Sequence, residues 1–186
     1  PVDRELPVYL PPGYDESGPP QVALWDFAAF TNSGPGHLNW RNQGENLVQR
    51  LDRLIHEGAL PPVVVPMPDC YTSLGGNQYI NSPAVGAYAD YVVEELVPLL
   101  AGAVNVIEGR EGRGVFGKSS GGYGALRHAM DHPDTWGGVD VTVTPANFTL
   151  ANGASRTLRI DVDIADVVIL GDWISGRVQL RATGSA

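Results

Sequence analysis

The sequence has little cysteine, no long apolar run and few basic residues, and each shortage excludes a class of protein. Its single cysteine, Cys70, can neither close a bridge within the chain nor supply a cluster of thiolate ligands. No apolar stretch approaches the roughly 20 residues that a membrane span needs. The formal net charge of −9 would repel a phosphate backbone. We therefore expect no disulfide scaffold, no thiolate metal centre, no membrane partner and no nucleic-acid partner.

What is present is enough for a folded protein. The chain has 186 residues, and 43% of them are hydrophobic, which allows a sizeable core. It opens at Pro1 with neither a methionine nor a signal-like apolar segment. We expect a soluble chain that is a processed or partial product.

Charge and proline divide the chain into two parts. Residues 1–140 contain 8 Lys or Arg and 17 Asp or Glu, whereas residues 141–186 contain four Arg and four Asp. Fourteen of the 15 prolines and all four histidines also lie before position 141. We therefore predict two units, 1–140 and 141–186.

The two parts also differ in hydrophobic period. In the first, strand-like runs at 6–10, 22–27, 63–66 and 114–117 alternate with apolar stripes of helical spacing at 47–55 and 88–99. This alternation predicts an α/β fold with a mainly parallel sheet and flanking helices. In the second, apolar residues alternate with polar ones at 139–143 and 157–164, which predicts a short antiparallel β tail.

The strongest chemical motif follows the strand-like run at 114–117. Gly117, Ser119 and Gly121 form G-x-S-x-G, the pattern of a nucleophile elbow in which a strand turns sharply into a helix. The residues two before and two after the serine crowd each other in that turn, so both must be small. We predict Ser119 at the apex of the turn, with its hydroxyl exposed.

A second motif overlaps the first. Residues 112–119 also fit G-x-x-x-x-G-K-[ST], the phosphate-binding P-loop. In a P-loop the residues between the glycines form a loop, but here they include Val115 and Phe116, which are typical of the strand itself. A nucleotide binder is kept as the least favoured alternative.

Several separated blocks in residues 1–140 resemble the esterase D or enterochelin-esterase-like family of α/β hydrolases. The blocks are 8–14, 24–28, 37–41, 75–79, 94–98 and 116–125. The resemblance implies a truncated α/β-hydrolase-like fold that hydrolyses carboxylic or thiol esters through an acyl-enzyme on Ser119, with no cofactor and a small-molecule ester as partner. It also implies an oxyanion hole formed by the N–H of Ser120 and by the segment around Phe27 and Ala28.

His37 and Lys118 are candidates for substrate contact, the first from the resemblance and the second from its position in the sequence. His37 lies in a loop that the family places near the rim of the active site. Lys118 stands beside the serine, where it could polarise an acyl oxygen. We predict no metal site, because no histidine pair shows the H-E-x-x-H pattern, although His128 and His132 are four residues apart.

The sequence departs from the family after the elbow. In this fold the triad partners follow the serine in the order Asp or Glu, then His, but the sequence has no histidine after His132. His128 and His132 lie on or just beyond the elbow helix, too far along it to return to Ser119. We therefore expect weak or absent turnover, and a non-catalytic fusion or fragment with a binding role is the main alternative.

The tail resembles part of a fibronectin-like or immunoglobulin-like β domain of subtilisin-type proteases. The match runs through residues 143–150, Gly153, residues 157–158 and residues 171–178. The esterase-like part favours a cytoplasmic location, whereas such a tail is compatible with an extracellular one.

Overall fold

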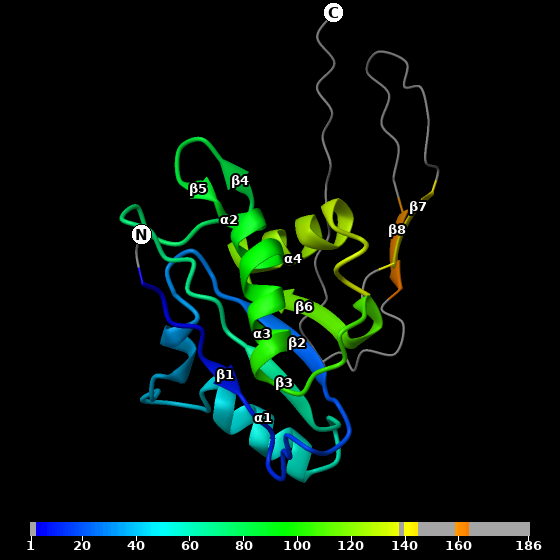
Figure 1. Ribbon diagram of the computed structural model, residues 1–186. Coiled ribbons are helices and arrows are strands. Elements are labelled where there is room, and N and C mark those ends of the chain that lie inside the picture. The colour runs from blue at the N-terminus through cyan, green and yellow to red at the C-terminus, as the bar shows by residue number, and fades with distance from the viewer. Residues whose placement is uncertain (1–2, 138–139, 145–158, 164–186) are drawn as a thin grey trace, which may run out of the picture.

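A four-stranded sheet with helices on both faces forms the centre of the computed structural model (Figure 1), which describes residues 3–137, 140–144 and 159–163. Its strands are β1 (Val8–Tyr9), β2 (Val22–Phe27), β3 (Val63–Pro66) and β6 (Arg113–Gly117). They lie in the order β1-β3-β2-β6. β2 pairs in parallel with β3 and β6, and β1 pairs antiparallel to β3. The predicted mainly parallel α/β sheet is therefore confirmed.

The two central strands are apolar runs because both of their faces are covered. Every residue of β3 is buried, as are residues 23–27 of β2. The bounds of both strands agree with the sequence prediction. β1 is shorter than the predicted 6–10, and β6 begins one residue before the predicted 114.

One face of the sheet is covered by helix α1 (Leu47–His56). Asn46 and Gln49 form a capping box. The backbone N–H of Gln49 donates a hydrogen bond to the Asn46 side chain, and the backbone N–H of Asn46 donates one to the Gln49 side chain. Leu51 is fully buried and packs with Leu24 and Val65 of the sheet. The capping box therefore determines where α1 begins, and the apolar stripe of α1 determines which side of the helix packs against the sheet.

The opposite face is covered by α4 (Ser120–Asp131) and by a continuous helical segment made of α2 (Tyr88–Asp90), η2 (Tyr91–Leu96) and α3 (Val97–Ala103). The η2 portion is a π-helical turn. Pro98 has no amide hydrogen to give to residue 94, and a wider turn immediately before it accommodates the missing bond. Val92 and Leu96 of this segment belong to the core that contains Trp25 and Phe27.

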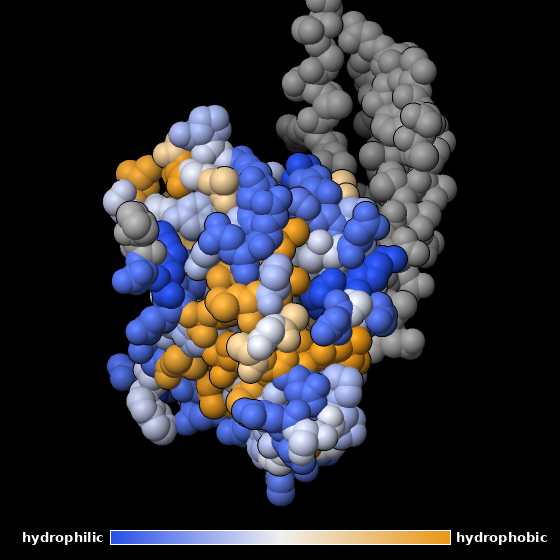
Figure 2. Space-filling model, viewed as in Figure 1, coloured by the Kyte–Doolittle hydropathy of each residue, from blue (hydrophilic) through white to orange (hydrophobic). Residues whose placement is uncertain are grey.

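Apolar side chains also reach the surface of this face. Figure 2 shows a band of them over α3. Leu99 of α3 is 58% exposed, whereas Leu100 beside it is buried. Among the described residues no helix is long and apolar enough to cross a membrane.

The remaining elements are short. They are the turns η1 (Pro35–Leu38) and η3 (Arg110–Gly112), the hairpin of β4 (Asn81–Ser82) and β5 (Gly86–Ala87), and the antiparallel pair β7 (Asp140–Thr144) and β8 (Arg159–Asp163). β7 and β8 are the described parts of the tail. The rest of the predicted tail, including most of its immunoglobulin-like resemblance, lies outside the described residues.

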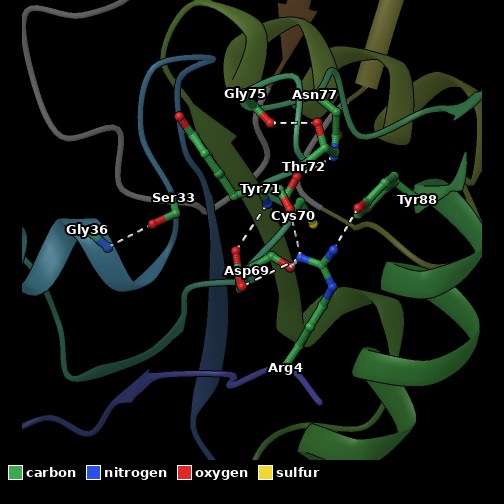
Figure 3. A network of polar contacts seen from close by, with 10 residues as sticks. All are labelled: Arg4, Ser33, Gly36, Asp69, Cys70, Tyr71, Thr72, Gly75, Asn77 and Tyr88. Atoms are coloured by element: carbon green, nitrogen blue, oxygen red, sulfur yellow. Dashed lines mark hydrogen bonds and ion pairs between the residues drawn. The ribbon is translucent and has the colours of Figure 1, made fainter. Parts of the chain in front are cut away.

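A polar network ties the amino-terminal segment to the loop after β3 (Figure 3). The Arg4 guanidinium donates to the carbonyls of Asp69 and Tyr71 at 3.0 Å each and to the Tyr88 hydroxyl at 2.8 Å. The Cζ atom of the Arg4 guanidinium also lies 5.5 Å from the centre of the Tyr88 ring. One side chain thus fastens the loop at 69–71 to the start of α2.

Candidate active site

Ser119 lies at a sharp turn between a strand and a helix. β6 ends at Gly117 and α4 begins at Ser120. The Ser119 backbone has φ 57° and ψ −118°, a conformation that residues with side chains rarely adopt. Ser119 is exposed. The structure thus gives this residue the position and the exposure that the elbow motif predicts.

The two glycines of the motif are required by close backbone contacts. A Cβ at Gly117 would lie 2.5 Å from the carbonyl oxygen of Phe27 and 2.6 Å from the carbonyl carbon of Gly121. A Cβ at Gly121 would overlap the Phe27 carbonyl and lie 2.8 Å from the carbonyl oxygen of Ala28. The elbow is therefore pressed against the end of β2, and only glycine fits at either position.

The overlapping P-loop motif has a different geometry from the one that phosphate binding needs. Residues 113–117 are strand β6, paired with residues 23–27 of β2 along their whole length. An anion-binding loop would leave these amides free to surround a phosphate. Here they belong to a sheet.

The predicted oxyanion residues lie next to the elbow. Ser120 is the first residue of α4, a position where the backbone N–H has no acceptor within the helix. Phe27 pairs with Gly117 in the β2–β6 register, and Phe27 and Ala28 are both buried. Segment 27–28 and the start of α4 thus form two sides of one small region at the carboxyl edge of the sheet.

Tyr79 supports this region from behind, a role that the sequence did not reveal. Its hydroxyl donates to the Ala28 carbonyl at 3.0 Å, and its ring stacks on Phe27 with centroids 4.0 Å apart. Its backbone has φ 58°, and its amide donates to the Asn77 side chain at 2.5 Å. No local pattern predicts a contact between residues about fifty positions apart in the chain.

His37 contacts the carboxylate of Asp26 through Nδ1. The Asp26 side chain is 4% exposed and the His37 side chain is 17% exposed, so the pair is largely removed from water. Asp26 stands near the end of β2, opposite Phe116 of β6. An Asp at the end of a buried strand is a signal that could have identified Asp26. Its partner, His37, lies in the short turn η1.

A cavity of about 230 Å³ opens beside the elbow. Asp26, His37, Gly117 and Lys118 contribute to its wall. Both residues predicted to contact substrate, His37 and Lys118, therefore line the same cavity. Lys118 is the residue immediately before Ser119 in the chain.

The other histidines lie elsewhere. His56 is exposed in the last turn of α1. His128 is buried in α4, where one ring nitrogen, Nε2, lies 2.7 Å from the Tyr79 carbonyl and the ring packs against Phe27 and Trp136. Burial lowers the pKa of His128 to about 4. His128 is a neutral core residue at ordinary pH, and its neighbour His132 is partly exposed.

The described residues contain no group of three or more His, Cys, Asp or Glu side chains that could hold a metal ion. Cys70 is buried, and burial raises the pKa of its thiol. A buried thiol of raised pKa is a poor nucleophile. Ser119, by contrast, is exposed.

Comparison with solved structures finds proteins of the same fold. The chain is similar to a ferulic acid esterase, with a TM-score of 0.59 and 24% identity over 69% of this chain and 49% of that one. It is similar to an S-formylglutathione hydrolase from Agrobacterium tumefaciens, with a TM-score of 0.51 and 24% identity over 69% of this chain and 48% of that one. It is also similar to an enterobactin esterase from Shigella flexneri, with a TM-score of 0.52 and 19% identity over 70% of this chain and 30% of that one.

The chain spans about half the length, or less, of these solved structures. No curated protein sequence matches it. The family model described as "Putative esterase" matches residues 2–149, which is most of the chain and extends past the predicted boundary at 140. Together with the α/β-hydrolase-like sheet, this match establishes that the chain belongs to the esterase family.

Proposed function

We propose that this chain is a carboxylic-ester hydrolase that works through an acyl-enzyme on Ser119. The observation that carries the proposal is the exposed Ser119 at a strained turn between β6 and α4, closed by Gly117 and Gly121. Membership of the esterase family supports the reaction class. The expected substrate is a small-molecule carboxylic ester or thioester.

In the proposed reaction the Ser119 oxygen attacks the ester carbonyl carbon. The carbonyl oxygen becomes an oxyanion, which the N–H of Ser120 and an amide of segment 27–28 would stabilise. The bond to the alcohol or thiol then breaks, and that group leaves with a proton. Water attacks the acyl-serine, releases the acid and returns the hydroxyl to Ser119.

Turnover is expected to be slow. A base must take the proton from Ser119, and the sequence has no histidine after His132 to serve in the usual order. Loss of one triad member typically lowers the rate by several orders of magnitude, while the oxyanion and binding contributions survive. The same observation favours a second candidate function, a non-catalytic module that binds an ester or a partner without turning it over.

The test is hydrolysis of a p-nitrophenyl acyl ester at high protein concentration. We expect slow turnover that Ser119→Ala removes and that Ser82→Ala, a change in the β4–β5 hairpin, leaves unaltered. His37→Ala, His56→Ala, His128→Ala and His132→Ala should be measured in parallel. Fast hydrolysis lost in Ser119→Ala and in one histidine variant would refute the expected slowness and identify a base. Hydrolysis that is indifferent to Ser119→Ala would refute the mechanism.

A further inference from the structure

The charge in the cavity beside the elbow differs from that of the chain around it. Residues 1–140 contain about twice as many acidic as basic residues, 17 against 8. Three of those eight basic residues, Arg41, Arg50 and Lys118, line this one cavity. Positive charge is therefore concentrated where an acidic protein would otherwise repel an anion.

The two carboxylates in the cavity wall both have cationic or histidine partners. Asp26 contacts His37. Glu45 accepts two hydrogen bonds from Arg53, at 2.7 and 3.1 Å, and Arg53 is not part of the cavity wall. Arg50 approaches the same carboxylate only at 4.0 Å, so Glu45 is neutralised chiefly by Arg53. The wall therefore has an excess of positive charge.

The cavity also has an apolar portion. Leu47 of α1 and Phe116 of β6 contribute to the wall, as do Gly117 and Lys118, the two residues that precede Ser119 in the chain. A group bound to Ser119 through an ester could extend a short carbon chain over the apolar portion. An anionic end of that chain would then reach the guanidinium groups, which bind carboxylates through paired hydrogen bonds.

We propose that this cavity, lined by Arg41, Arg50 and Lys118, is an anion subsite, and that the preferred substrates are esters with a free carboxylate on a short apolar chain. This inference rests on the proposed function, because it deepens the substrate class of the same site. The carboxylate selects the substrate, and Ser119 performs the chemistry. Arg41 and Arg50 determine specificity and take no part in bond breaking.

The experiment separates binding from hydrolysis. A chemical-shift titration of the isotope-labelled Ser119→Ala variant compares monomethyl succinate, which has a carboxylate, with dimethyl succinate, which has none. We expect the anion to bind about tenfold more tightly, with an affinity that falls as salt rises, because the arginines are partly exposed. The double variant Arg41→Gln, Arg50→Gln should lose that preference. Arg127→Gln, which removes a charge that pairs with Asp131 on α4, should keep it.

Equal binding of the two esters, or equal loss in the Arg127→Gln control, would overturn the subsite. The proposed function is read out separately, as acylation of Ser119 in the unaltered chain by p-nitrophenyl acetate. Selective anion binding without Ser119 acylation would refute the hydrolase and leave the subsite standing. Ser119 acylation without anion preference would refute the subsite and leave the hydrolase standing.

Discussion

Gly121→Ala is the substitution for which the structure gives the sharpest expectation. A methyl group there would overlap the Phe27 carbonyl and lie 2.8 Å from the Ala28 oxygen. All of these contacts are backbone atoms of β2 and the segment after it, so no side chain can rotate away. Relief requires α4 and the end of β2 to separate, which would also move the proposed oxyanion donors.

The magnitude follows from two opposing contributions. Overpacking a well-packed site costs about 1–3 kcal/mol, and contact with backbone places this case at the upper end. Alanine is favoured over glycine inside a helix by about 1 kcal/mol. We therefore expect Gly121→Ala to lower the free energy of unfolding by about 1–2 kcal/mol. In a chain of this size, each kcal/mol of lost stability lowers the melting temperature by about 2–4 °C.

Urea unfolding, followed by circular dichroism, is the assay. Gly102→Ala is the matched control, because Gly102 is also in a helix, α3, and an added Cβ there meets nothing within 4 Å. We expect Gly102→Ala to raise the free energy of unfolding by up to about 1 kcal/mol. If Gly121→Ala is as stable as the unaltered chain, the close approach of elbow and strand is refuted.

Three further predictions concern groups away from the glycines. His37→Ala leaves the Asp26 carboxylate buried without its partner and should lower the free energy of unfolding by about 3 kcal/mol, because His37 is partly exposed. The exposed His56→Ala should leave stability unchanged, and equal effects of the two changes in urea unfolding would contradict the pairing. His128 has a pKa of about 4 when folded and 6.5 when unfolded, so the unfolded chain binds the extra proton between these values, and stability should fall by up to about 3 kcal/mol as pH drops from 6.5 to 4. His128→Gln should flatten that part of the pH profile, and an unchanged profile would refute the assignment. Buried Cys70 should react with a thiol reagent at pH 8 only after unfolding, and rapid reaction of the native chain would contradict its burial.

Local patterns predicted much of the fold. β2 and β3 are buried runs of apolar residues, and α1 has a periodic stripe, so each is specified by residues close together in the sequence. The elbow was predictable for the same reason, because a side chain at Gly117 would clash with Gly121 within the same turn. These features depend on neighbours in the chain.

The features that sequence reasoning missed depend on distant contacts. The antiparallel pairing of β1 with β3 joins residues 8–9 to 65–66, and nothing in β1 itself specifies that direction. The stack of Tyr79 on Phe27 and the contact of His37 with Asp26 arise only when loops fold back over the edge of the sheet. Arg4 is a further case, because its partners Asp69 and Tyr88 lie far along the chain.

The proposed acyl-enzyme on Ser119 is tested most directly by locating the acyl group after reaction with p-nitrophenyl acetate, by mass spectrometry of the intact chain and of its peptides. We predict one acetyl group on Ser119, formed slowly and absent from the Ser119→Ala variant, because Ser119 is exposed at the strained turn. An acetyl group found on another residue, with hydrolysis unaffected by Ser119→Ala, would contradict it.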